Sequence, residues 1–417
     1  MTFHEAEEYL LGLELFGMRF GLDRMHRLMT VLGLPQHRFA SIHVVGTNGK
    51  SSTARFIAAL LERHGVKSGS YTSPHVRSFR ERIEVAEGPV PETSFAAAVA
   101  EAAHAAELVD RTAAEDDRVT QFEALTAAAY HELGRQGVEV AVVEAGLGGR
   151  YDATNVIPSK VQVLTSVGLE HTRWLGPTVT DIAEEKLAVV RDHATLVVGP
   201  LDPEARAVAE RVAAERHARL LAPEVGAGAF QSRNLALAAA AAEAFLGRAL
   251  DHGAMERVAA ETLVPGRLEV VGERPLTVYD GAHNPSGAAA LAEALPEVAG
   301  GRAPLVGVVS VLEDKDVAGM LRALLPAFDQ VVFTRCANPR SLSPATLESL
   351  SAQLRERSDR SAPEALGPPA CVVADPHAAV ARARELAGPG GAVVATGSIY
   401  LIADLVRDSA DARASTL

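Results

Sequence analysis

The stretch HVVGTNGKSS, residues 43–52, decides the fold. An apolar run at 42–45 leads into it, and residues 51–63 follow with apolar side chains at helical spacing, so the pattern predicts a strand, a glycine-rich turn and a helix. Glycines let backbone N–H groups turn toward phosphate oxygens, and Lys50 can reach the β- and γ-phosphates. We interpret the turn as a phosphate-binding loop. Its candidate nucleotide ligands are Thr47, Asn48, Gly49, Lys50, Ser51 and Ser52.

The loop departs from the common pattern G-x-x-x-x-G-K-[ST], because Val44 stands where that pattern has its first glycine. The shorter form G-T-N-G-K is a variant of the same device. Taken alone, it leaves open a plain tight turn between a strand and a helix.

Composition narrows the class of protein. The 417 residues are 48% hydrophobic and 22% charged, which suits a globular chain of two domains. The net charge of −13 argues against nucleic-acid and anionic membrane partners, which need a basic face. The first residues are acidic, and no apolar run reaches the roughly 18 residues of a membrane span. We therefore expect a cytoplasmic enzyme that acts on small molecules.

Two successive α/β patterns organise the chain. Apolar runs at 138–143 and 161–167, separated from 42–45 by amphipathic stretches such as 122–133, predict parallel strands with helical crossovers. An Ala-rich helical region, 232–261, is followed by the segment 263–266, whose proline and glycine interrupt helices and make a plausible hinge. We predict one domain over residues 1–264 and a second over residues 265–417.

The second domain repeats the alternation. Its predicted strands are residues 276–279, 304–310, 330–334, 370–373 and 391–396. The predicted fold class is therefore α/β, with an N-terminal P-loop ATPase-type α/β domain and a smaller, doubly wound, Rossmann-like C-terminal α/β domain.

Several motifs in fixed order point to a family. The loop G-T-N-G-K resembles that of the Mur ligase superfamily, and the other motifs resemble its folate branch, the dihydrofolate synthase/folylpolyglutamate synthase family. These motifs are GLDR at 21–24, TSPH at 72–75, FRERI at 79–83, FEALT at 122–126, VEAGLGGRYDATN at 143–155, GLEH at 168–171, IAEEK at 182–186, PGRLE at 265–269 and DGAHNP at 280–285.

The resemblance implies a magnesium site. Glu144 ends a predicted strand, where open α/β sheets place their ligands, and a carboxylate there can hold Mg²⁺. In the family, residues matching Ser73, Glu144 and His171 ligate magnesium, and two Mg²⁺ ions accompany ATP. The residue after the loop lysine is commonly glycine in the family, whereas here it is Ser51, which we count as an additional candidate ligand.

Lys186 has two interpretations. Its acidic neighbours favour a solvated helix lysine. The resemblance instead implies a lysine carbamylated by CO₂ that supports a second magnesium, although the motif continues with Leu187-Ala188-Val189 where the family has Ala-Gly-Ile. The candidate catalytic residues are thus Lys50, Glu144, His171 and Lys186.

Further ligands come from the resemblance alone. Residues matching Asn234, Arg267 and Asp280 hold ATP in the family, although Phe230 replaces a family histidine before Asn234, and Asp280 could otherwise belong to a simple turn. The candidates for the pterin or folate side are Gly21, Leu22, Asp23, Arg24, Phe122 and Asp152. His283 is a candidate neighbour of the incoming L-glutamate.

The resemblance implies ATP-dependent addition of L-glutamate to dihydropteroate or to reduced folate (poly)glutamates, through an acyl phosphate and with release of ADP and phosphate. The family suggests a monomer. Three alternatives share parts of this pattern: a Mur-type ligase of a cell-wall precursor, a P-loop kinase, and a nonenzymatic nucleotide switch. The motifs at 21–24 and 72–75 favour the folate branch, and the motifs at 265–269 and 280–285 argue against a kinase.

Overall fold

The computed structural model describes residues 1–13, 21–114, 117–224, 230–357 and 368–407. It divides into two compact units. The first consists mainly of Met1–Ala227 and Gln231–Thr262, and the second mainly of Leu263–Thr416. Each unit has its own sheet and core.

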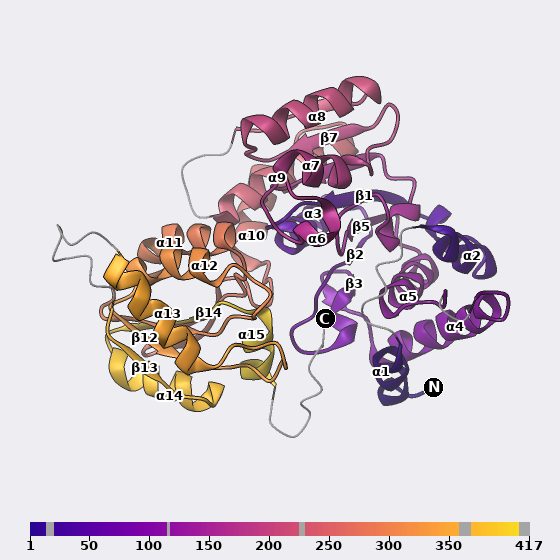
Figure 1. Ribbon diagram of the computed structural model, residues 1–417. Coiled ribbons are helices and arrows are strands. Elements are labelled where there is room, and N and C mark those ends of the chain that lie inside the picture. The colour runs from indigo at the N-terminus through magenta and orange to yellow at the C-terminus, as the bar shows by residue number, and fades with distance from the viewer. Residues whose placement is uncertain (14–20, 115–116, 225–229, 358–367, 408–417) are drawn as a thin grey trace. The chain divides into compact units, whose positions relative to one another are not determined.

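The first unit is built on an eight-stranded sheet of order β4-β3-β2-β5-β1-β6-β7-β8 (Figure 1). Six strands, β2, β5, β1, β6, β7 and β8, are parallel, because buried β-branched runs joined by helices pair in this way. Strands β3 and β4 add an antiparallel edge next to β2. The strands are β1 Ala40–Val45, β2 Ser68–Tyr71, β3 Ile83–Val85, β4 Gly88–Pro89, β5 Val140–Glu144, β6 Val161–Leu164, β7 Thr195–Val198 and β8 Arg219–Leu221.

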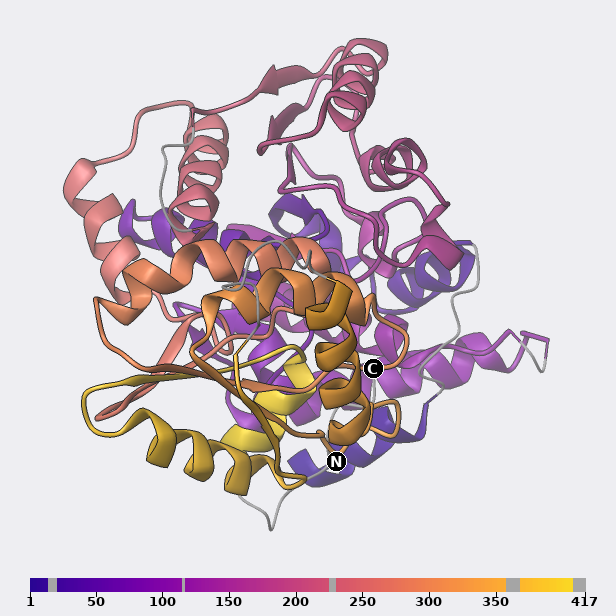
Figure 2. The ribbon, with the colours of Figure 1, turned by 60° about the vertical axis from the view of Figure 1, so that its left-hand side comes forward.

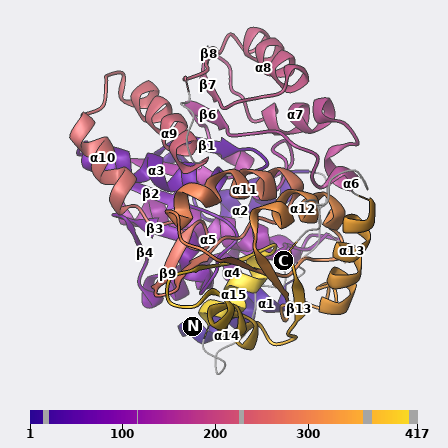
Figure 3. The same cartoon turned by 90° about the vertical axis from the view of Figure 1, so that its left-hand side faces the viewer.

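Helices cover both faces of this sheet. One face packs against α3 Lys50–Arg63, α9 Phe230–Leu246 and α10 His252–Glu261. The other packs against α1 Phe3–Gly12, α2 Asp23–Val31, α4 Glu92–Asp110 and α5 Gln121–Gln136. The remaining helical segments are η1 Pro35–His37, η2 Phe79–Arg82, η3 Ala153–Val156, α6 Thr172–Leu175, α7 Val179–Leu187 and α8 Pro203–Glu215. In Figure 3, α3, α9 and α10 lie together on one side of this unit.

The second unit is a six-stranded sheet of order β13-β12-β11-β14-β10-β9. Its strands are β9 Glu269–Glu273, β10 Leu276–Tyr279, β11 Leu305–Val309, β12 Gln330–Phe333, β13 Ala370–Val372 and β14 Ala392–Thr396. Figure 2 shows α11 and α12 side by side over this sheet, and they pack against each other. Its helical segments are α11 Pro285–Ala299, α12 Val317–Leu324, η4 Leu325–Ala327, α13 Pro344–Arg357, α14 Pro376–Ala387 and α15 Ile399–Val406.

The predicted α/β fold class is confirmed, and some details differ. The predicted Ala-rich helical region contains two helices, because Gly247 takes a φ of 67° and ends α9 there. The strand predicted at 161–167 ends at Leu164, since the next residues turn toward the loop. The antiparallel strand β9 was not predicted. Among the described residues, no helix has the length and apolarity needed to cross a membrane.

Candidate active site

The phosphate-binding loop lies between β1 and α3 and is held by the segment that follows β6. Gly46 and Gly49 have φ values of 150° and 81°, in the region that only glycine adopts easily. The backbone N–H of Thr47 donates to the carbonyl of Ser166, and that of Asn48 to the Ser166 hydroxyl, both at 2.9 Å. A side chain at Gly46 would meet the hydroxyl of Thr165 at 2.0 Å. The loop is therefore shaped by contacts outside its own motif.

The loop sets its lysine at the start of a helix. Lys50 is the first residue of α3, and its Nζ donates to the Thr47 carbonyl at 3.2 Å. The helix N-terminus carries unsatisfied N–H groups and positive partial charge, which suits a phosphate. Ser52 is buried within α3.

Asn234, from α9, lies directly beside this loop. A Cβ added to Gly49 would be 2.4 Å from Asn234 Oδ1, so only glycine fits there. The amide is buried and donates from Nδ2 to Gln231 Oε1 at 3.1 Å. Two residues 185 positions apart in the chain, 49 and 234, are thus brought together at the predicted nucleotide site.

Glu144 forms the centre of an oxygen-rich cluster. It is the last residue of β5 and is only 1% exposed. Its Oε1 accepts from the Ser51 hydroxyl at 3.0 Å, and its Oε2 accepts from the backbone N–H of Ser73 at 2.9 Å. A carboxylate and two hydroxyl-bearing residues are hard oxygen donors, the ligands that Mg²⁺ prefers, so these residues fit a magnesium ion.

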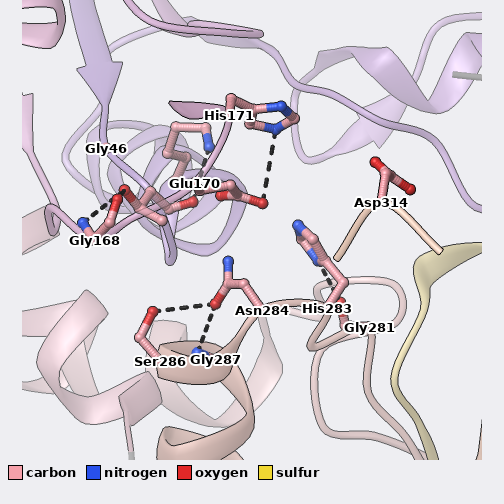
Figure 4. Close-up of polar contacts among 12 residues, drawn as sticks. Gly46, Gly168, Glu170, His171, Gly281, His283, Asn284, Ser286, Gly287 and Asp314 are labelled. Carbon is pink, nitrogen blue, oxygen red and sulfur yellow. Dashed lines mark hydrogen bonds and ion pairs between the residues drawn. The ribbon is translucent and has the colours of Figure 1, made fainter. Parts of the chain in front are cut away.

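His171 lies on a separate segment. It has a φ of 52° and stands at the N-terminus of α6, with Nε2 3.7 Å from Glu170 Oε1 (Figure 4). The same segment contacts the phosphate loop, because the N–H of Gly168 donates to the Thr47 hydroxyl at 3.0 Å. In the described parts of the chain, no three His, Cys, Asp or Glu side chains gather as a metal cluster. The role of His171 as a metal ligand stays a prediction.

Lys186 is buried and points into the loop. Only 4% of the residue is exposed, and its Nζ donates to the Gly46 carbonyl at 2.9 Å. Burial, together with the nearby charge of Lys50, lowers the pKa of Lys186 from 10.5 to about 7. The interpretation as a solvated helix lysine is therefore wrong.

Asp152 and Phe122 meet at the turn after β5. Asp152 is buried, and its Oδ2 accepts the N–H of Leu147 at 2.7 Å. Burial raises the pKa of Asp152, while its hydrogen bonds oppose that rise. A Cβ on Gly146 would be 2.6 Å from the ring of Phe122, which stacks on Tyr71. Both candidates therefore contact the turn at Gly146-Leu147.

The GLDR motif is placed at the start of α2. Gly21 has a φ of 139°, Leu22 is the N-cap residue, and Asp23 begins the helix. Arg24 is 7% exposed and forms a buried ion pair with Glu123, with Nε to Oε1 at 3.0 Å. Its guanidinium also contacts Asp117. Arg24 therefore ties α2 to the N-terminus of α5, which is a structural use of this residue.

In the second unit, the candidate residues cluster after β10. Asp280 is buried and accepts the N–H groups of Leu268 at 3.0 Å and Ala282 at 2.9 Å. Burial raises the pKa of Asp280, and the nearby guanidinium of Arg267 opposes that rise. His283 Nδ1 lies 2.8 Å from the Gly281 carbonyl, as the dashed line in Figure 4 shows. The unit thus brings Arg267, Asp280 and His283 together.

Two contributors to the site were missed. Thr165 and Ser166 hold the loop backbone, with Thr165 Oγ1 donating to the Asn48 carbonyl at 2.6 Å. Their positions near the carboxyl end of the parallel strand predicted at 161–167 are the signal that could have identified them, because neighbouring parallel strands end at the same edge.

Comparisons with known proteins identify related families, sequences and structures. The family described as Mur ligase middle domain matches residues 44–235, and the one described as Mur ligase, glutamate ligase domain, matches residues 266–399. The chain is 36% identical over 382 residues to a dihydrofolate synthase/folylpolyglutamate synthase of Mycobacterium tuberculosis, covering 81% of this chain and 78% of that relative. It is 32% identical over 441 residues to the protein of that name from Bacillus subtilis, covering 97% and 98%. A solved structure of Mycobacterium tuberculosis folylpolyglutamate synthase complexed with ADP matches with a TM-score of 0.86 and 32% identity, covering 97% of this chain and 98% of that one.

Proposed function

The chain belongs to the dihydrofolate synthase/folylpolyglutamate synthase family of the Mur ligase superfamily and is an ATP-dependent ligase, and we propose that it joins L-glutamate to a pterin-bearing carboxylate through an acyl phosphate. The observation that carries the proposal is the position of Glu144 between Ser51 and Ser73, next to a loop that ends in Lys50. These residues supply oxygen atoms and a positive charge beside one phosphate-binding turn, which supports the proposal.

A carboxylate needs activation before an amine can displace one of its oxygens. A carboxylate oxygen of the acceptor attacks the γ-phosphorus of ATP, and ADP leaves. The α-amine of glutamate then attacks the acyl carbon, the amide forms with loss of a proton, and inorganic phosphate leaves with that carboxylate oxygen. Lys50 and the N–H groups of the loop bind the transferred phosphate where its charge develops.

Magnesium fits the oxygen cluster, and its proposed ligands are Ser51, Ser73, Glu144 and His171. When bound, Mg²⁺ neutralises charge on the phosphates during transfer. Glu144 is preorganised for this task, because its two oxygens are already oriented by Ser51 and Ser73.

Lys186 is the proposed site of carbamylation. A neutral lysine amine adds to the carbon of CO₂ and loses one proton, which leaves a carbamate anion that still has one N–H. The pKa of Lys186 near 7 supports this proposal, since a large share of the amine is neutral at physiological pH. The retained N–H can keep donating to the Gly46 carbonyl.

The remaining assignments extend this proposal. Residues 1–264 form the ATP-binding domain with the acceptor elements, and residues 265–417 form the ligase domain that receives L-glutamate beside His283. ATP contacts Asn234, Arg267 and Asp280, and the acceptor contacts Phe122, Asp152 and the segment 21–24. The enzyme acts as a cytoplasmic monomer.

The experiment that tests the function measures phosphate release from ATP with Mg²⁺, using dihydropteroate and tetrahydrofolate as separate acceptors. Each acceptor is tested with and without L-glutamate, and the amide product is followed by mass. The proposal expects phosphate release together with one added glutamate per turnover. Phosphate release without an amide would favour a kinase or a switch, and turnover with only a cell-wall precursor would favour the Mur-type alternative.

A further inference from the structure

His43 is a buried polar residue that the proposed mechanism does not use. It lies in the middle of β1, three residues before Gly46, and is 0% exposed. Its neighbours Ile42 and Val44 pack into the core beneath α3, so the imidazole lies on the opposite face of the strand. Burial and the charge of Arg191 lower the pKa of His43 to about 3, which makes the ring neutral at physiological pH.

A short chain of hydrogen bonds leads from this ring to Asp152. His43 Nε2 lies 2.9 Å from the hydroxyl oxygen of Thr154, and that hydroxyl donates to Asp152 Oδ1. Asp152 also accepts the N–H groups of Leu147 at 2.7 Å and Thr154 at 3.0 Å, one on each oxygen. Both oxygens are thus acceptors, so the Thr154 hydroxyl proton is directed at Asp152.

This direction fixes the tautomer of His43. Because the Thr154 hydroxyl gives its proton to Asp152, its oxygen accepts from His43, and the imidazole proton is on Nε2. Nδ1 is buried and has no hydrogen-bond partner among the described residues. The ring therefore uses one nitrogen only, and that nitrogen serves Thr154.

We infer that His43 is a positioning residue for acceptor binding, which acts through Thr154 to hold Asp152 and the turn at Gly146-Leu147. This inference rests on the proposed function, because Asp152 is assigned there to the acceptor. The turn begins two residues after Glu144 and carries the contact between Gly146 and Phe122. Loss of these hydrogen bonds would loosen the acceptor-binding residues without changing the phosphate loop's own contacts.

A purely structural role would not require a polar ring. Burying an imidazole with one unpaired nitrogen costs free energy that a leucine in the same core would not cost. The glutamine amide can place a donor near the position of Nε2, and its carbonyl oxygen takes over from Nδ1 as a second polar atom. Comparing His43→Gln with His43→Leu therefore separates the effect of the hydrogen bond from that of packing. Comparing Thr154→Ser with Thr154→Val does the same for the next residue of the hydrogen-bond chain.

The test measures kcat and the KM values for acceptor and ATP in these four variants, with thermal unfolding to compare only folded proteins. His43→Leu and Thr154→Val should raise the acceptor KM about tenfold, the effect of one lost buried hydrogen bond, and leave the ATP KM within about twofold. His43→Gln and Thr154→Ser should stay near the wild type. Equal effects on both KM values, or no difference within each pair, would overturn the inference.

A second readout does not depend on turnover. The ¹⁵N chemical shifts of His43 should report a proton on Nε2 and none on Nδ1. The opposite tautomer would contradict the proposed hydrogen bonds from His43 through Thr154 to Asp152. A wild-type enzyme that turned over neither acceptor would refute the proposed function instead, while the tautomer would still test the hydrogen-bond chain.

Discussion

The amine of Lys186 donates a 2.9 Å hydrogen bond to the carbonyl of Gly46, the first glycine of the phosphate loop. The contact joins two elements 140 positions apart in the chain. It places a titratable side chain, almost fully buried, against the backbone that binds phosphate.

Replacing Lys186 with methionine should lower kcat by about 10²-fold or more, the usual cost of one preorganised electrostatic group. If Lys186 is carbamylated, wild-type activity should fall in CO₂-free buffer and return with bicarbonate, and ¹³C-labelled bicarbonate should give a carbamate signal absent from the variant. The exposed Lys160→Met is the control. Full activity of Lys186→Met would contradict the assignment.

Lys186 should also make stability depend on pH. Its pKa falls from 10.5 to about 7 on folding, so between these values the unfolded chain binds a proton that the folded chain does not. The free energy of unfolding should therefore rise with pH from 7 to 10.5, by roughly 1 kcal/mol per pH unit from this group. Urea unfolding in CO₂-free buffer should show this rise in wild type relative to Lys186→Met. A constant difference between the two proteins across that range would contradict the shifted pKa.

Ser51 should affect the magnesium requirement. Its hydroxyl donates to Glu144 Oε1 at 3.0 Å, so removing it frees one carboxylate oxygen and takes away a candidate ligand. Ser51→Gly should raise the Mg²⁺ concentration for half-maximal activity about tenfold, as loss of a group supporting a metal does. Ser51→Thr, which keeps the hydroxyl, is the control. An unchanged Mg²⁺ dependence in Ser51→Gly would exclude this role.

Gly146→Ala should damage acceptor binding. Its Cβ would be 2.6 Å from Cζ of Phe122, so the ring must move from its place on Tyr71. We expect the acceptor KM to rise about tenfold, as strain of 1–3 kcal/mol would produce, with the ATP KM unchanged. Gly134→Ala in α5, whose Cβ meets its nearest atoms at 3.4 Å, is the matched control. An unaltered acceptor KM would mean that this turn does not line the acceptor site.

Arg24→Met should unfold more readily than wild type. The change leaves the buried carboxylate of Glu123 without its cation, which typically costs about 3–5 kcal/mol. Denaturant unfolding measures this directly, and Arg24→Met with Glu123→Gln should recover part of the loss. If stability stayed constant while the acceptor KM rose, Arg24 would serve binding rather than structure.

The predictable parts of the fold are those with strong local patterns. The phosphate loop and its helix could be assigned because glycines and a lysine stand between an apolar run and a helical period. Buried parallel strands such as Val140–Glu144 read as continuous apolar runs. Short edge strands do not, since Ile83–Val85 has only three residues and Glu269–Glu273 is largely exposed.

The candidate site was less predictable from local sequence patterns than the fold. Glu144 could be placed from the end of its strand, but the pairing of Asn234 with Gly49 depends on tertiary packing that no local pattern encodes. Lys186 was ambiguous for the same reason, because its helix has acidic neighbours while the fold buries its amine. Only the family resemblance pointed to both residues.

The measurement that tests the central claim most directly follows an oxygen atom. The acceptor is prepared with ¹⁸O in its carboxylate, turned over with ATP and L-glutamate, and the released phosphate is examined by mass. An acyl phosphate predicts one ¹⁸O atom transferred to inorganic phosphate for each amide formed, with ADP as the other product. Phosphate free of ¹⁸O, or AMP in place of ADP, would contradict the account.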